Sequence, residues 1–120
     1  MAVDEKTIER LRASKNEWER QTKERGRQSG ERWATAIATA PELDRLARAA
    51  DPDVETGLAC TVANYARTFF DTIRPGENTD AEISRFWEPW LLGPDDFCDD
   101  FVIGFAEAAI GVWDEAEGKL

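Results

Sequence analysis

The stretch from 95 to 118, DDFCDDFVIGFAEAAIGVWDEAEG, decides the fold. Its apolar residues return every three or four positions, which is the period of a helix with one buried face. Gly93 and Pro94 mark where we expect this helix to start, and Gly118 is a natural stop. Val102 and Trp113 lie beside the apolar stripe, which consists of Phe97, Phe101, Phe105, Ala108 and Val112.

Three further helices are predicted upstream of this one. Thr39 and Glu42 have the spacing of a capping box, and so do Thr79 and Glu82, so helices should start at both places. Pro89 should end or kink the helix that starts at Thr79, near residue 88. Between them, Asp51-Pro52-Asp53 separates the helix after Thr39 from one over 54–73, whose apolar line is Val54, Leu58, Val62, Tyr65, Ala66, Phe69 and Ile73.

Residues 1–38 predict a long, charged helix capped by Asp4. Its apolar line is Ile8, Leu11, Trp18, Trp33 and Ile37, and it is interrupted by Gly26 and Gly30. Two glycines four apart remove side chains from one stripe, so this segment is a packing notch or a hinge. Gly104 and Ala108 offer a similar small-residue face on the last helix, and faces of this kind could also pair two copies of the chain as a homodimer.

No segment alternates polar and apolar residues for long enough to predict a strand. The expected fold is therefore all-α, a small bundle of about five helices in one domain over 1–120. Residues 1–38 form the charged N-terminal helix, which either packs on the bundle or projects from it as an arm. Residues 39–120 form the acidic bundle.

Charge is unevenly distributed along the chain. The net charge is -10, but residues 1–32 hold nine Lys or Arg against seven Asp or Glu, so the remainder carries -12. A negative molecule repels nucleic acid and anionic membranes, and the nearly neutral N-terminal helix argues against nucleic-acid binding. We therefore expect a basic protein surface as partner, and no membrane.

The two cysteines, Cys60 and Cys98, sit among apolar residues at helical spacing, which favours reduced, core-facing thiols. No signal peptide is recognisable, and no stretch approaches the roughly 18 apolar residues of a membrane span. The expected location is the cytoplasm.

Histidine is absent, which removes the commonest general base and metal ligand. No glycine-rich phosphate loop is present, and the acids around Cys98 should disfavour its thiolate. We expect a protein that is not an enzyme and uses no cofactor.

Asp95, Asp96, Asp99 and Asp100 form an acidic cluster that has three readings. Acids in a first helical turn complement the helix dipole, and carboxylates four apart could bind magnesium, although no second acidic pair matches them on another helix. The third hypothesis is a partner-binding surface in which Trp87 and Trp90 act as anchors beside the acidic residues. Alternatively, these two tryptophans belong to the hydrophobic core.

The first hypothesis for function is a non-enzymatic protein-binding module whose acidic surface engages a basic partner. In overall character, though through no motif, the chain resembles the small acidic helical proteins that phages and bacteria use to inhibit a partner, some as nucleic-acid mimics. The alternatives are a small metal-dependent helical hydrolase and an antitoxin-like regulator that uses the N-terminal arm.

Overall fold

The computed structural model describes residues 3–49, 65–76, 79–93 and 96–120. These residues form five α-helices and one 3-10 turn, and none of them lies in a strand. The all-α prediction is therefore confirmed. The elements are α1 (Glu5–Ala36), α2 (Ala40–Ala49), α3 (Tyr65–Ile73), α4 (Asp80–Trp87), η2 (Glu88–Trp90) and α5 (Asp99–Glu117).

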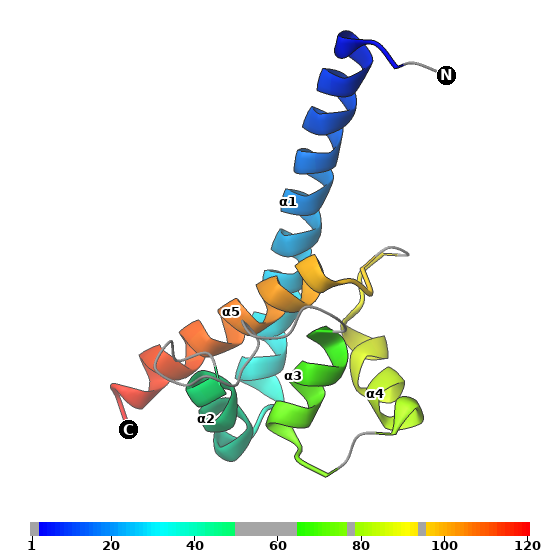
Figure 1. The fold of residues 1–120 in the computed structure, drawn as a ribbon. Coiled ribbons are helices and arrows are strands. Elements are labelled where there is room, and N and C mark those ends of the chain that lie inside the picture. The colour runs from blue at the N-terminus through cyan, green and yellow to red at the C-terminus, as the bar shows by residue number, and fades with distance from the viewer. Residues whose placement is uncertain (1–2, 50–64, 77–78, 94–95) are drawn as a thin grey trace.

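The long helix α1 begins at the residue that the sequence indicates, because the carboxylate of Asp4 accepts a 2.8 Å hydrogen bond from the backbone N–H of Thr7. Its 32 residues span about 48 Å. The molecule measures 56 × 33 × 30 Å, so α1 is longer than the bundle is wide. Its C-terminal half packs on α5, and its N-terminal half extends past the bundle (Figure 1). The packed and the projecting arrangements thus describe different halves of one helix.

Local chemistry also sets the other helix ends. Thr39 and Glu42 form the expected capping box, with the Thr39 N–H donating to Glu42 Oε1 at 3.0 Å and the Glu42 N–H to Thr39 Oγ1 at 3.4 Å. Thr79 accepts from the N–H of Glu82. The helix α4 ends at Trp87, where Pro89 converts the next turn to 3-10 geometry. The helix predicted over 54–73 is observed from Tyr65, and its earlier part, including Cys60, lies outside the described residues.

The last helix starts later than the sequence predicts. Cys98 is the N-cap of α5, and Phe97 is 51% exposed, so its assignment to the buried stripe is wrong. The cause is Asp96, whose carboxylate accepts from the N–H of Leu92 and whose carbonyl accepts from the N–H of Cys98. These bonds hold the chain in a turn at the point where the helix was expected. Cys98 is a free, partly buried thiol.

Phe105 is the centre of an aromatic core. The centre of its ring lies 4.9 Å from the ring centre of Trp87, 5.3 Å from that of Phe69 and 5.5 Å from that of Trp33. The pairs with Trp87 and Phe69 have the edge-to-face geometry that aromatic rings prefer. These residues come from α1, α3, α4 and α5, so a single cluster joins four helices. Within the described residues, no helix combines the length and apolar character needed to cross a membrane.

Candidate functional site

The tryptophans that the sequence proposed as anchors are parts of the core. Trp87 has none of its surface exposed, and its indole N–H donates to the carbonyl of Ala66 at 3.2 Å. Trp90 is 9% exposed, and its carbonyl accepts a 2.6 Å hydrogen bond from Ser29 of α1. This placement corrects the prediction that the pair projects toward a partner. The sequence could not separate the two readings because both place tryptophan beside a helix break.

The acidic cluster is divided between interior and surface. Asp96 is fully buried and forms an ion pair with Arg25 of α1, with 2.9 Å between the Arg25 Nε and Asp96 Oδ1 atoms. It joins a loop to α1 and is unavailable to a basic partner, which corrects its assignment to the contact surface. Asp99 is exposed, Asp100 is partly exposed, and Asp95 lies outside the described residues.

Asp100 lies close to other acids. Burial raises the pKa of its carboxyl group, and the nearby charges of Glu19 and Asp99 raise it further. A raised carboxyl pKa means that the ionised form is disfavoured in the folded state. The described part of the chain contains no group of three or more side chains placed to hold a metal ion.

The predicted helix-packing residues meet where α1 crosses α5, and we call Gly26, Gly30 and Gly104 the glycine crossing. A Cβ atom on Gly26 would lie 2.9 Å from the carbonyl carbon of Phe101, and one on Gly30 would lie 2.7 Å from the Cα atom of Phe105. On the other helix, a Cβ on Gly104 would lie 3.0 Å from the carbonyl carbon of Lys23. All three positions therefore require glycine for the two backbones to approach this closely.

Ala108 lies one turn beyond Gly104 and is only partly buried. It lines a shallow depression with Glu107 and with residues of α1, among them Arg27. Arg27 and Lys23 both form ion pairs with Glu107, at 2.6 and 3.2 Å. Gly26, Gly30 and Gly104 are thus occupied by the contact between α1 and α5 within one chain, whereas Ala108 faces the depression. Pairing of two copies through these faces stays a prediction.

The N-terminal half of α1, residues 5–21, is here called the arm. Ile8, Leu11 and Trp18 are 43%, 49% and 50% exposed, so the apolar line that the sequence indicated is not buried over this half. The same face is buried from Thr22 to Ala34. Ile37, at the end of the predicted line, is 61% exposed, so its assignment to the buried side is wrong. Figure 1 shows the arm extending away from the other helices.

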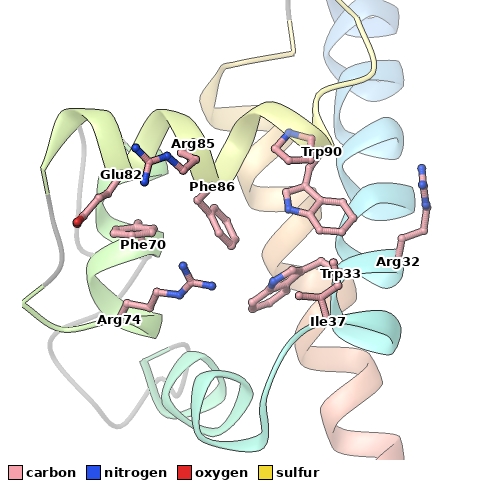
Figure 2. Close-up of a pocket in the computed structure, with 10 residues that line it drawn as sticks. Arg32, Trp33, Ile37, Phe70, Arg74, Glu82, Arg85, Phe86 and Trp90 are labelled. Carbon is pink, nitrogen blue, oxygen red and sulfur yellow. The ribbon is translucent and has the colours of Figure 1, made fainter.

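A second feature was not found by sequence reasoning. An open pocket of about 560 Å³ lies between α1, α3, α4 and η2 (Figure 2). We call it the arginine pocket because three arginines line it, Arg32 on the side of α1 and Arg74 and Arg85 on the opposite side (Figure 2). Its lining residues are Arg32, Trp33, Ile37, Phe70, Arg74, Glu82, Arg85, Phe86, Pro89 and Trp90.

Glu42 of α2 fixes one of these arginines. The Arg74 Nε atom donates to Glu42 Oε2 at 2.8 Å, and the Arg74 guanidinium lies 5.4 Å from the ring centre of Phe86. Burial acts to raise the pKa of Glu42, but the hydrogen bonds from Arg74 and Thr39 outweigh it and hold that pKa below its ordinary value. Glu42 is therefore charged at neutral pH and keeps Arg74 in place.

Comparisons of this chain with models of protein families, with curated proteins and with solved structures found no match.

Proposed function

We propose that this chain is a non-enzymatic protein-binding module and that the arm is its contact element. The observation that carries the proposal is the exposed line of Ile8, Leu11 and Trp18 on a helix that projects beyond its own bundle. A protein gains no stability by keeping large apolar side chains in water, so such a line on a preformed helix favours an intermolecular contact.

The spacing of this line favours a helix as the occupant. Ile8, Leu11, Lys15, Trp18 and Thr22 alternate steps of three and four residues, which is the spacing of a helix that packs along another helix. At the glycine crossing the same face of α1 already packs on α5. The arm thus continues an established helix-packing face past the end of its partner within the chain.

Charges beside the line favour a different protein over a second copy. Glu5, Arg12 and Glu19 follow one edge of the line at intervals of seven residues. If two arms paired antiparallel with Ile8 facing Trp18, Arg12 would face Arg12 and Glu5 would face Glu19. Like charges at these positions disfavour that pairing.

The proposed partner is therefore an amphipathic helix with basic residues opposite the two glutamates and an acidic residue opposite Arg12. The net charge of -10 of this chain also favours a basic partner, because long-range attraction speeds association with cationic surfaces.

Photo-crosslinking in the native host tests this proposal. Benzoylphenylalanine replaces Leu11 on the apolar line in one variant and Ala13 on the opposite side of the arm in the matched control. We expect the substitution at Leu11, but not the one at Ala13, to crosslink a segment with apolar residues at helical spacing and basic residues beside them.

Three outcomes would contradict the proposal. Equal crosslinking from both positions would show that the apolar line does not select the partner, and no crosslink from position 11 would show that the arm has none. A crosslinked dimer of this chain, matched by a dimeric mass in solution, would replace the foreign helix with a second copy.

A further inference from the structure

The arginine pocket is a concave surface with room for a side chain of another molecule. Its volume of about 560 Å³ falls in the range of binding pockets, which is roughly 300 to 1,000 Å³. Phe86 lies on one side of the pocket, and Ile37 and Trp90 lie on the other (Figure 2). Ile37 is 61% exposed, so part of this apolar lining is a large side chain in contact with water. Concave apolar surface that is open to solvent favours a contact with another molecule.

Two cationic side chains lie on opposite sides of this apolar lining. Arg32 belongs to the α1 side and Arg85 to the α4 side, and their guanidinium groups point away from each other (Figure 2). Both arginines are exposed, and neither has an ion-pair partner in the described part of the chain. One small anion cannot reach both of them. The ligand that fits therefore carries two negative groups, one on each side of an apolar group.

Arg74, the third arginine of the pocket, is already ordered by its neighbours. Its Nε atom donates to Glu42 Oε2 at 2.8 Å, and its guanidinium lies 5.7 and 5.4 Å from the ring centres of Phe70 and Phe86. Glu42 offsets the charge of Arg74, so the uncompensated positive charge of the pocket comes from the other two arginines. An ordered guanidinium beside aromatic rings is a surface on which a further ring can pack at little cost in entropy.

We propose that the arginine pocket binds a segment of a partner protein in which an aromatic residue lies between two acidic residues. The aromatic ring enters the pocket between Phe86 and Trp90, and the carboxylates on its two sides bind Arg32 and Arg85. Charge complementarity decides the occupant, because the chain carries -10 while three arginines and one glutamate line this pocket. An acidic segment is attracted to this place and repelled by much of the remaining surface.

This contact is separate from the one proposed for the arm. All residues that line the pocket lie outside residues 5–21, and the two surfaces fit partners of opposite charge. The loss of one contact therefore leaves the other intact.

NMR titration of the full, isotope-labelled chain tests this proposal. The probes are three synthetic peptides in which one, two or three glycines separate a central phenylalanine from a glutamate on each side. Matched controls carry glutamine in place of both glutamates, or alanine in place of the phenylalanine. We expect at least one probe to shift the side-chain resonances of Arg32, Arg85 and Trp90 and to bind at least about tenfold more tightly than either of its controls.

Each acidic residue of the probe should depend on one arginine. Arg32→Gln and Arg85→Gln should each weaken binding by about three- to fivefold, which is the size expected for one exposed ion pair. In the Arg32→Gln variant, removing one of the two peptide glutamates should have no further effect, whereas removing the other should still weaken binding. In the Arg85→Gln variant the two glutamates should exchange these roles. Loss of both glutamate effects in one variant would contradict the two-sided site.

Glu82 provides a change of opposite sign. It lines the pocket on the same side as Arg85 and repels an acidic ligand (Figure 2). Glu82→Gln should therefore tighten binding of the probe by about twofold. Arg12→Gln, on the arm, removes a charge from an exposed helical position and should change the affinity by less than about 1.5-fold, because salt screens distant charges.

Other results would overturn the proposal. If no probe shifts these resonances at millimolar concentration, or if either control binds as tightly as its parent peptide, the pocket is not a site for such a segment. If Arg12→Gln weakens binding as much as Arg85→Gln, the effect is general electrostatics. Tighter binding of a single-stranded oligonucleotide would replace the peptide with nucleic acid. Shifts of the same resonances with protein concentration alone would replace the foreign segment with a second copy.

Discussion

The two halves of α1 carry the same kind of face but have different surroundings. From Thr22 to Ala34 the face consists of small residues and one tryptophan, and the backbone of α5 lies directly against it. In the arm the face consists of Ile8, Leu11 and Trp18, which no described residue buries. Small side chains in a helix therefore mark where the chain packs on itself, and large ones in the arm mark where it does not.

Ion pairs follow the same division. Lys23 and Arg27, in the packed half, reach across to Glu107 of α5. In the arm, Lys15 pairs with Glu19 and Arg20 pairs with Glu17, all within α1. Surface pairs of this kind contribute little to stability.

The largest expected effect separates a core residue from an arm residue. Phe105→Ala should lower the free energy of unfolding by about 3 to 5 kcal/mol, because it removes a fully buried ring at the centre of the aromatic cluster. Trp18→Ala should lower it by less than about 0.5 kcal/mol, because Trp18 is exposed. Chemical denaturation measures both, and equal losses would mean that the arm is part of the cooperative fold.

Replacing glycine by alanine should lower stability at the glycine crossing and raise it at an open position of α5. Gly30→Ala should destabilise the protein by about 1 to 3 kcal/mol, since the new methyl group would meet the backbone of Phe105. The matched control is Gly111→Ala in α5, where a Cβ meets nothing within 4 Å, and this change should stabilise by up to about 1 kcal/mol. A raised melting temperature for Gly30→Ala would refute the close approach of the two helices.

The buried carboxylate of Asp96 should matter more than any exposed acid. Asp96→Asn should lower the free energy of unfolding by about 1 to 3 kcal/mol, because it weakens charged hydrogen bonds from Arg25 and Leu92 in a buried site. Asp114→Asn, at an exposed position of α5, should change it by less than about 0.5 kcal/mol. If the Asp96 variant is as stable as the wild type, this loop is not held by the ion pair.

The smallest effect is a pH dependence. Because the folded pKa of Glu42 lies below its ordinary value of 4.5, its ionisation stabilises the folded state above that pH. This contribution is lost as the pH falls through the folded pKa. Glu42→Gln should therefore destabilise the protein at neutral pH. In acid, the free energies of unfolding of the wild type and the variant should become equal. An unchanged difference between wild type and variant from neutral to acid pH would contradict the role of this carboxylate.

Most of the fold could be predicted from the sequence because helix ends depend on neighbouring residues. Asp4, Thr39, Thr79 and Pro89 each act within a few positions of themselves, and all four act as expected. The close approach at Gly26 and Gly30 was also recognisable, since glycine in a helix interior has a cost that packing offsets.

The candidate sites depended on contacts that no local pattern encodes. Asp96 looks like an exposed helix-capping acid until Arg25, far away in the sequence, is placed beside it. The arginine pocket unites Arg32, Arg74 and Arg85, which carry no shared motif. The composition could show which residues were available for a site, but only the fold places these three around one pocket.

Native-state hydrogen exchange along α1 tests whether the packed half and the arm differ in stability, because it reports the opening free energy of each amide. We predict that amides from Gly26 to Ala34 exchange only through global unfolding, whereas those from Ile8 to Trp18 exchange several orders of magnitude faster through local fraying. The change should occur near Thr22, where burial of the face begins. Uniform protection along the whole helix would contradict a division of α1 into a packed half and a free arm.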